Sequence, residues 1–558
     1  MSRLSLILII SLFAFSINFY YGHQGLMPLD DLQNFNSGFR VLQGDFPFRD
    51  YYSVTGPFLD ILQSIIYKIF GINWQSFVLH ASLMNCLYSI SIFIFLQKLN
   101  FSKINSFLFS LSGGLLMYPA AGNPTVEHSS LILSVMGTFL FIIGSKENKN
   151  YLLFFSIFIF GISFFVKQVP TIYFIFFCIL LFFFQIFNFI SQKKIFLIFI
   201  YMVTVSLLFV FYFELNGVKF NQIINQYYFI AKNLGELRFQ NLSFHNFYEN
   251  TSKLFFLLFL LVPSLYISFI TKNKNGFLIL FFLSLLIILY EIHSNNQPIS
   301  YALLPIFVAF FQYFYHNKIQ DFNFVKIYLL LIIIYAFYRI LRFENFYLFG
   351  FLIFIISYFL NKKKIISNLL IIYLTISSLL YFEKYIKIRA WDDLSKNDLL
   401  VSFDGNIIDK KLSYLKWRTV YFENIETEKK LITTTLHYLK NLEDDVKYIL
   451  ISDYQIYNII LDRKDYSPVK YWYKDATYPS KKSKYRNEFE FFFKKKIVEN
   501  NINFLIIDNT SNFKSVELEE FSWLFKCLEK KQLDPQLNLF EVFEIKLNCI
   551  NLVKSSNL

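Results

Sequence analysis

Long apolar runs separated by short polar loops make up most of the first two-thirds of the chain. Runs such as YLLFFSIFIFGISFFV (151–166) and IFLIFIYMVTVSLLFVFYF (195–213) contain no charged residue. Their length is close to the roughly 20 residues that a helix needs to cross a bilayer. The pattern predicts 13 membrane-spanning helices, at about residues 4–20, 76–97, 104–121, 128–144, 151–166, 170–190, 195–213, 254–270, 276–292, 300–315, 327–341, 346–360 and 365–382.

The charges between these runs predict how the chain is oriented. If the N-terminus is cytoplasmic, the cytoplasmic loops carry 14 basic residues and only two acidic ones, Glu147 and Asp321. Cytoplasmic loops of membrane proteins have this excess of Lys and Arg. We therefore expect an uncleaved first span with a cytoplasmic N-terminus. The loop 21–75 and everything after about residue 383 are then extracytoplasmic.

After the last predicted span the pattern changes to short apolar runs within charged sequence. Predicted strands are VKYILISD (446–453), NINFLIID (501–508) and LNLFEVFEIK (537–546). Predicted helices are TEKKLITTTLHYLKNL (427–442) and EFEFFFKKKIVENN (488–501). Alternation of strands and helices favours an α/β fold.

The fold class that follows is an α-helical polytopic membrane protein with a small C-terminal extracytoplasmic α/β domain. We expect a transmembrane domain over residues 1–382, which includes the outer loop 21–75. The α/β domain would occupy residues 383–558.

Composition agrees with this class and argues against nucleic-acid binding. Hydrophobic residues make up 55% of the 558 and charged residues only 17%, which is more apolar surface than a soluble domain needs. The net charge of +13 divides into +12 on the cytoplasmic loops, −1 on the outer loops and +2 on residues 383–558. No basic face remains to bind a phosphate backbone. The four cysteines show no metal-site spacing, and the sequence leaves open whether Cys527 and Cys549 pair.

An acidic pair stands directly behind the first span. PLDDLQNF (28–35) places Asp30 and Asp31 at the start of a helix-like stretch. Acids there are also typical of a helix N-cap, which is the purely structural interpretation. The residues that follow, GFRVLQGDFPFRDYYSVTGPFLD (38–60), add a helix, a Gly-Asp turn, an aromatic-Arg-Asp step and a Gly-Pro break.

This order of features resembles the first outer loop of the GT-C glycosyltransferases. That family includes protein O-mannosyltransferases and lipid A aminoarabinose transferases. The resemblance is carried by Asp30-Asp31, the stretch Gly44 to Asp50, and Gly56-Pro57. Weaker similarity continues in GISFFVKQVP (161–170), SYALLPIFVAF (300–310) and YILISDYQIYNIILDRKDYSPVKYW (448–472).

The resemblance implies a GT-C-like fold and a membrane glycosyltransferase. Such an enzyme moves a sugar from a polyprenyl-phosphate donor to a lipid, glycan or protein acceptor, at the extracytoplasmic face of the inner membrane. It implies Asp30 as the general base that activates the acceptor hydroxyl, with Asp31 orienting it or contacting the acceptor. Arg49 and Asp50, in the same motif, are implied substrate contacts. A divalent metal ion is left open as a cofactor.

Polar residues at the predicted outer ends of spans are further candidates for substrate binding. Lys167, Arg339 and Arg342 lie against the positive-inside trend and together predict a clamp for the lipid phosphate; the alternative is that they snorkel to the interface. Further predicted contacts at outer ends and loops are Glu127, His128, Gln168 and His293. For Glu127 a helix cap is the structural alternative.

Two other functions fit a polytopic membrane protein of this size. A transporter or flippase for lipid-linked saccharides would need charged or broken helices at mid-membrane, and few mid-span charges are found. A polymerase or ligase for such saccharides would more naturally have one large outer loop late in the chain and no terminal α/β domain. The acids in an early outer loop favour the transferase.

Overall fold

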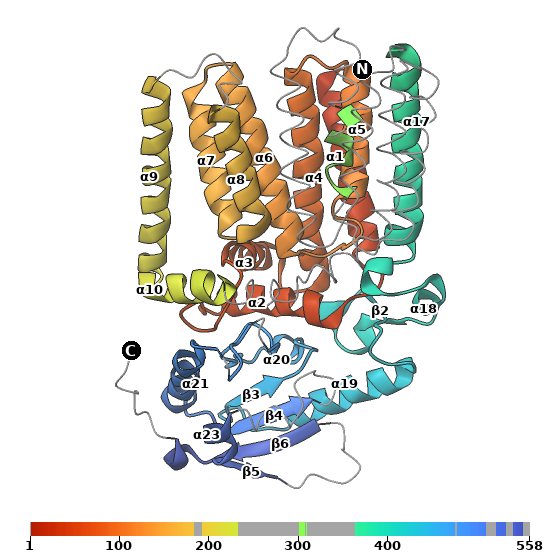
Figure 1. Ribbon diagram of the computed structural model, residues 1–558. Helices are drawn as coiled ribbons and strands as arrows, with labels where there is room; N and C mark the ends of the chain where they lie inside the picture. The colour runs from red at the N-terminus through yellow and green to blue at the C-terminus, as the bar shows by residue number, and fades with distance from the viewer. Residues whose placement is uncertain are drawn as a thin grey trace, which may run out of the picture. The chain divides into compact units, whose positions relative to one another are not determined.

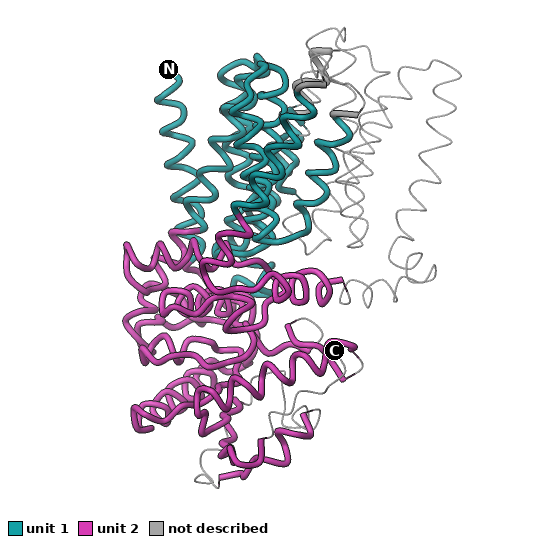
Figure 2. The backbone as a smooth tube through the Cα atoms, turned by 90° about the vertical axis from the view of Figure 1, so that its left-hand side faces the viewer, with its two compact units in different colours: residues 1–22, 81–208, 240–396 teal, residues 23–80, 209–239, 397–558 magenta. Residues whose placement is uncertain are grey.

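The computed structural model describes residues 2–183, 192–232, 301–306, 308–309, 363–474, 477–481, 483–508, 521–531 and 540–550. The chain divides into two compact units, coloured separately in Figure 2. Unit 1 comprises residues 1–22, 81–208 and 240–396, and unit 2 comprises residues 23–80, 209–239 and 397–558. The predicted outer loop therefore groups with the C-terminal segment. The predicted boundary near residue 382 stays a prediction.

Eight of the predicted spans coincide with described helices (Figure 1). These helices are α1 (Arg3–Tyr21), α4 (Trp74–Lys98), α5 (Lys103–Leu116), α6 (Val126–Lys146), α7 (Asn150–Phe164), α8 (Gln168–Phe183), α9 (Gln192–Leu215) and α17 (Lys363–Tyr381). Within the described ranges, four are long and apolar enough to cross a membrane: α1, α4, α6 and the Lys194–Leu215 part of α9. Predicted spans 254–270, 276–292, 327–341 and 346–360, half of 300–315, and the end of 170–190 from residue 184 on lie outside the described residues.

Close packing and shared hydroxyl groups hold α6, α7 and α8 together in unit 1. A Cβ on Gly137 of α6 would lie 3.2 Å from the Phe160 ring of α7, a tighter contact than Cβ atoms usually make, so glycine favours the close approach of the two helices. The Ser163 hydroxyl lies 2.9 Å from that of Ser134 and 2.7 Å from that of Thr171, which links all three helices. Buried polar groups in an apolar layer need such partners. This bundle fixes the start of α6 and the end of α7, where the predicted site residues Glu127, His128 and Lys167 lie.

Unit 2 contains a four-stranded sheet of strand order β3-β4-β6-β5. The strands are β3 (Tyr448–Ile451), β4 (Phe504–Asp508), β5 (Leu528–Lys530) and β6 (Phe540–Ile545). β3 and β4 are parallel, and the other two pairings are antiparallel. β3, β4 and β6 fall inside the three predicted stretches, whereas β5 was not predicted.

Helices cover both faces of this sheet. Phe489, Phe493 and Ile497 of α21 (Arg486–Asn500) share one buried cluster with Ile449 and other strand residues. On the other face, Tyr438 of α19 (Ile425–Lys440) packs on Phe540, with ring centroids 4.8 Å apart.

The remaining described elements are η1 (Pro28–Leu32), α2 (Gln33–Leu42), α3 (Phe58–Phe70), α10 (Phe220–Ile223), η2 (Ile224–Ile230), η4 (Phe382–Lys387), η5 (Ala390–Asp392), α18 (Lys396–Leu400), β1 (Phe403–Asp404), η6 (Gly405–Ile407), η7 (Lys410–Leu412), β2 (Lys416–Trp417), α20 (Tyr457–Ile460), α23 (Ser522–Phe525) and η9 (Leu547–Cys549).

The early loop is joined to the C-terminal segment by backbone pairing and by buried charge. Gln24 bridges to Lys416, and Tyr52 bridges to Val469. The Arg40 guanidinium contacts Asp465 at 3.7 Å and donates to the Ser467 carbonyl at 3.0 Å. Burial alone would lower the pKa of Arg40, but Asp465 and Asp45 raise it. Segments separated by about 400 residues thus share one folded unit.

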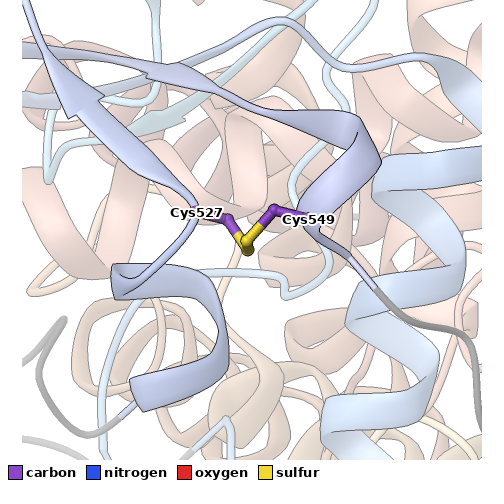
Figure 3. Close-up of a disulfide and its surroundings, with 2 residues drawn as sticks. All are labelled: Cys527 and Cys549. Atoms are coloured by element: carbon purple, nitrogen blue, oxygen red, sulfur yellow. A yellow bond between two sulfur atoms is a disulfide. The ribbon is translucent and has the colours of Figure 1, made fainter.

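A disulfide joins Cys527 and Cys549 (Figure 3). The two Cα atoms lie 5.5 Å apart, which is within the usual range for a disulfide. Cys527 directly precedes β5, and Cys549 follows β6, so the bond closes the antiparallel β5–β6 pair. Disulfides form and persist in oxidising compartments.

We expect the double variant Cys527→Ser, Cys549→Ser to unfold at a lower temperature than the wild type. A cross-link across 22 residues stabilises by about 3 kcal/mol in the loop-entropy estimate. Thermal unfolding of the purified chain in detergent measures the change. The matched control is Cys86→Ser, which replaces a thiol that is not in a disulfide. Equal unfolding temperatures for the double variant and the wild type would contradict the expectation.

Candidate functional site

The two acids of the first loop have different environments. η1 carries both, and α2 continues from it without a break. Asp31 is 4% exposed, and its Oδ2 accepts a hydrogen bond of 2.9 Å from the Met27 amide. This contact ties down the start of the helical segment, as a capping carboxylate does. Asp30 is exposed, and its Oδ1 lies 3.4 Å from the Gln33 side-chain amide. Of the pair, Asp30 is therefore the carboxylate that a solvent-borne group can reach.

A second carboxylate from the C-terminal segment interacts with Asp30. Asp453 follows β3, is almost fully buried, and accepts a 2.9 Å hydrogen bond from the Tyr421 hydroxyl. Burial raises the pKa of Asp453 to about 6; the Tyr421 hydrogen bond opposes the shift, while Asp508 and Asp30 add to it. A carboxyl group whose pKa is moved toward neutrality mainly by burial is a candidate for acid–base chemistry.

Buried Asp508, at the end of the neighbouring parallel strand, supports this group of side chains. Its Oδ2 accepts hydrogen bonds from the Ser452 hydroxyl at 2.9 Å and from the Tyr457 hydroxyl at 3.2 Å. Asp453 and Asp508 therefore stand at the carboxyl ends of parallel strands, where ligand sites of α/β sheets are commonly found. Asp453 was not among the predicted site residues, although its position at the end of VKYILISD was a usable signal.

We expect Asp453→Asn to change how stability depends on pH. The folded pKa of about 6 exceeds the unfolded value of roughly 3.9. The stability contributed by this group is therefore present below pH 4 and is lost as the pH rises through 6. Between pH 4 and pH 7.5, the free energy of unfolding of the wild type should fall by on the order of 1–3 kcal/mol relative to that of the variant. Paired thermal unfolding at the two pH values measures this difference; parallel curves would contradict it.

The predicted substrate contacts Arg49 and Asp50 are engaged with the loop itself. The Arg49 side chain contacts Asp50 Oδ2 at 2.7 Å and donates to the Gly44 and Asn216 carbonyls, each at 2.7 Å. Asp50 Oδ2 also accepts from the Phe46 amide at 2.7 Å. These contacts fix the turn 44–50. Both side chains are half-buried, so part of each reaches the surface.

Three predicted residues come together in unit 1. Lys167 Nζ lies 2.5 Å from Glu127 Oε1, and both side chains are about one-fifth exposed or less. Glu127 is in the first turn of α6, next to His128, and Lys167 stands between α7 and α8. His128 is buried, its Nδ1 lies 2.7 Å from the Thr125 hydroxyl, and its ring stacks on Tyr118. Gln168, the first residue of α8, is half-buried.

The loop before α6 contains further polar groups that the sequence did not single out. Asn123 is fully buried, and neither its Oδ1 nor its Nδ2 has a hydrogen-bond partner in the described part of the chain. Arg389 holds this loop by donating to the Ala120 carbonyl at 2.8 Å and the Ala121 carbonyl at 3.0 Å. Gly122 has φ +73°, and a Cβ at this position would lie only 2.6 Å from the Gly22 Cα, which is a clash. The loop that leads into Glu127 and His128 is thus tightly constrained.

The remaining predicted residues, His293, Arg339 and Arg342, lie outside the described residues. The phosphate clamp of Lys167, Arg339 and Arg342 therefore stays a prediction. Among the residues that the structure describes, no group of three or more His, Cys, Asp or Glu side chains is arranged to hold a metal ion.

The solved structures to which this chain is similar include two of ArnT from Cupriavidus metallidurans. One is ArnT from Cupriavidus metallidurans in the apo state, at 10% identity and a TM-score of 0.42, over 99% of this chain and 100% of that one. The other is the same protein bound to undecaprenyl phosphate, at 10% identity and a TM-score of 0.43, over 97% of this chain and 98% of that one. No protein-family model matches the chain, and no curated protein matches it.

Proposed function

We propose that this protein is a membrane glycosyltransferase of the GT-C type. It transfers a sugar from a polyprenyl-phosphate-linked donor to a lipid, glycan or protein acceptor at the extracytoplasmic face. Asp30 is the general base. The chain's apolar helices supply the membrane setting, and the disulfide between Cys527 and Cys549 supports an oxidising compartment for unit 2.

One observation above all supports this proposal: of the two acids in the loop motif, Asp30 is exposed, whereas Asp31 is buried and accepts a hydrogen bond from the Met27 amide. Glycosyl transfer to a hydroxyl needs a carboxylate that can take up a proton near neutral pH. Asp453, which accepts a hydrogen bond from the Tyr421 hydroxyl at 2.9 Å, interacts electrostatically with Asp30 and is a second carboxyl group in the same unit.

The proposed reaction follows from these groups. Asp30 removes the proton from the acceptor hydroxyl as the acceptor oxygen forms a bond to the anomeric carbon of the sugar. The bond between that carbon and the phosphate oxygen breaks, and the electron pair leaves with the polyprenyl phosphate. Asp31 does not take the proton in this scheme, because its Oδ2 accepts from the Met27 amide; its role is to fix the helical segment that carries Asp30.

The departing phosphate needs a positive partner. We propose that Lys167 contributes to that role, with Glu127 orienting its ammonium group through the 2.5 Å contact. Buried Asn123, three residues before the start of α6, adds an amide donor to the same unit. Undecaprenyl phosphate, the lipid bound to ArnT in one of the two similar structures, belongs to the class that we propose for the donor.

The direct test uses membranes that contain the wild-type chain and a panel of radiolabelled polyprenyl-phosphate sugars. We expect label to move from the polyprenyl lipid to a second lipid, glycan or protein fraction. The fraction that gains label identifies the acceptor class. Membranes from cells that lack the chain are the control. No transfer from any donor, with the protein present in normal amounts, would overturn the proposal; movement of an intact lipid-linked saccharide between leaflets would favour a flippase.

A further inference from the structure

Helix α3 of unit 2 has its polar side turned inward and its apolar side turned outward. The polar residues that it buries are Asp60, Gln63 and Ser64. The large apolar residues that it exposes are Leu62, Ile65, Ile69 and Phe70. Ile65 is 48% exposed and Ile69 is 66% exposed. A surface helix of a soluble protein has the reverse arrangement, with its apolar side packed on the core.

Partners in unit 2 fix the rotation of α3 about its axis. Asp60 forms the buried ion pair with Lys470, at 2.8 Å. Gln63 Oε1 lies 2.8 Å from His80 Nδ1. A Cβ on Gly38 of α2 would lie only 2.5 Å from Gln63 Cγ, so α2 and α3 are closely packed. The polar side of α3 is therefore held against the protein, and its apolar side has to face outward.

Both ends of α3 adjoin helices that are long and apolar enough to cross a membrane. At its start, the Phe58 ring packs on Phe209 and Tyr212, near the end of α9, with centroids 5.4 Å and 5.8 Å apart. At its end, only three residues separate Phe70 from Trp74, the first residue of α4. Both α4 and α9 contain a candidate span. The end of one span and the start of another therefore meet α3.

The length of α3 excludes a crossing of the bilayer. It has 13 residues, which is roughly 20 Å of helix, whereas the hydrocarbon core of a bilayer is about 30 Å thick. A helix that joins the ends of two spans without crossing lies along the bilayer surface. An apolar side that faces away from the protein is typical of a helix at that surface, and soluble proteins rarely expose contiguous apolar patches.

The segment after α9 also exposes aromatic side chains. Phe220 of α10 is 52% exposed, and Tyr228 of η2 is 59% exposed. The same segment packs on the first loop, because the rings of Tyr227 and Phe48 lie 5.7 Å apart. Amphipathic aromatic side chains such as Tyr are enriched where a membrane meets water. This segment therefore extends the apolar surface of α3 within unit 2.

We propose that the exposed side of α3 lies in the lipid bilayer, at the boundary between headgroups and acyl chains. Leu62, Ile65 and Ile69 contact acyl chains, and the exposed Lys68 reaches headgroup phosphate. Because α2 packs on α3, the helical segment that carries Asp30 is held beside the headgroups, where the phosphate of a polyprenyl donor lies. That last consequence rests on the proposed function, whereas the lipid contact does not.

The first test locates α3 with a fluorescent label on the full-length protein in phosphatidylcholine nanodiscs. The label, NBD, is attached to Ile65→Cys or Ile69→Cys in a Cys86→Ser background, where the remaining free cysteine of the described residues, Cys178, is buried. The matched control is Lys495→Cys, at an exposed position of α21. We expect doxyl-labelled phosphatidylcholine to quench the label on α3 several-fold more than the control, and aqueous iodide to quench the control several-fold more.

Two results of this test would overturn the inference. Equal quenching by iodide at all three positions, with no effect of the doxyl lipid, would place the outer side of α3 in water. Protection of the α3 label from both quenchers would show that protein covers this side, either another part of the chain or a second copy.

The second test uses the wild type and needs no variant to fold. Phosphatidylcholine with a photoactivatable group near the carbonyl end of its acyl chain is crosslinked to the protein, and the labelled peptides are identified by mass spectrometry. We expect label in residues 58–70 and none in residues 486–500. Label in α1, which exposes Leu4, Leu8 and Leu12, without label in residues 58–70 would contradict the lipid contact. Neither test measures sugar transfer, so each can fail or succeed independently of the transferase proposal.

Discussion

Asp30→Asn is expected to slow sugar transfer by roughly 10²–10⁴-fold, the usual contribution of a general base. The substitution keeps the size of the side chain and its ability to accept the contact from Gln33, which lies 3.4 Å from Oδ1. It removes only the ability to take up the acceptor proton. Because Asp30 is exposed, its replacement leaves no buried charge unpaired, and we expect the protein level to stay unchanged. Initial rates at saturating donor and acceptor measure the effect on kcat.

The matched control is Asp31→Asn, one residue further on. Asn keeps an oxygen that can accept from the Met27 amide, as Asp31 Oδ2 does at 2.9 Å. Asn and Asp cap helices about equally well, so we expect near-wild-type transfer. Near-wild-type activity in Asp30→Asn would mean that Asp30 is not the general base and that the acidic pair has only a structural role. Loss of activity in Asp31→Asn alone would identify Asp31 as the general base.

The sequence predicted those parts of the fold that depend on local pattern. The positions of α1, α4, α6 and α9 follow from apolar runs long enough to cross a bilayer. The strands β3, β4 and β6 follow from short runs rich in Ile, Leu, Val and Phe. In both cases the signal lies within one segment, so neighbouring residues are enough to detect it.

Grouping of the first loop with the C-terminal segment could not be predicted, because it depends on pairs that are far apart in sequence. Arg40 forms an ion pair with Asp465, and Asp60 forms one with Lys470. In the sequence, nothing distinguishes these charged residues from the other charged residues near them. Their burial is a property of the folded unit, and it separates them from the many exposed charges around them.

The candidate site was predicted only in part for the same reason. The motif pointed to both Asp30 and Asp31, but exposure of one and burial of the other cannot be derived from adjacent letters. Asp453 was missed because it acquires its raised pKa from burial and from residues of other segments. Asn123 was missed because an unsatisfied amide can be detected only when all of its neighbours are known.

Lys470→Met is expected to lower the stability of unit 2 strongly. Lys470 Nζ lies 2.8 Å from Asp60 Oδ1, and the two side chains are 3% and 0% exposed. Asp60 also accepts from the Ser37 hydroxyl at 2.7 Å and from the Tyr51 hydroxyl at 3.1 Å. These two neutral donors cannot balance a full negative charge away from water. Breaking a buried pair by removing one partner costs about 3–5 kcal/mol.

Two further variants make this expectation specific to the buried pair. Lys495→Met removes a lysine from an exposed pair, where Lys495 and Glu499 lie 3.5 Å apart and are more than half exposed, and should cost under about 1 kcal/mol. The double variant Asp60→Leu, Lys470→Met should recover most of the loss, because no isolated charge remains. Thermal unfolding and limited proteolysis of the full chain measure the stability of Lys470→Met and of these two variants. If the first loop and the C-terminal segment fold together, Lys470→Met should make residues 23–80 sensitive to protease along with residues 397–558. If residues 23–80 stay protected in a destabilised variant, the two segments fold separately.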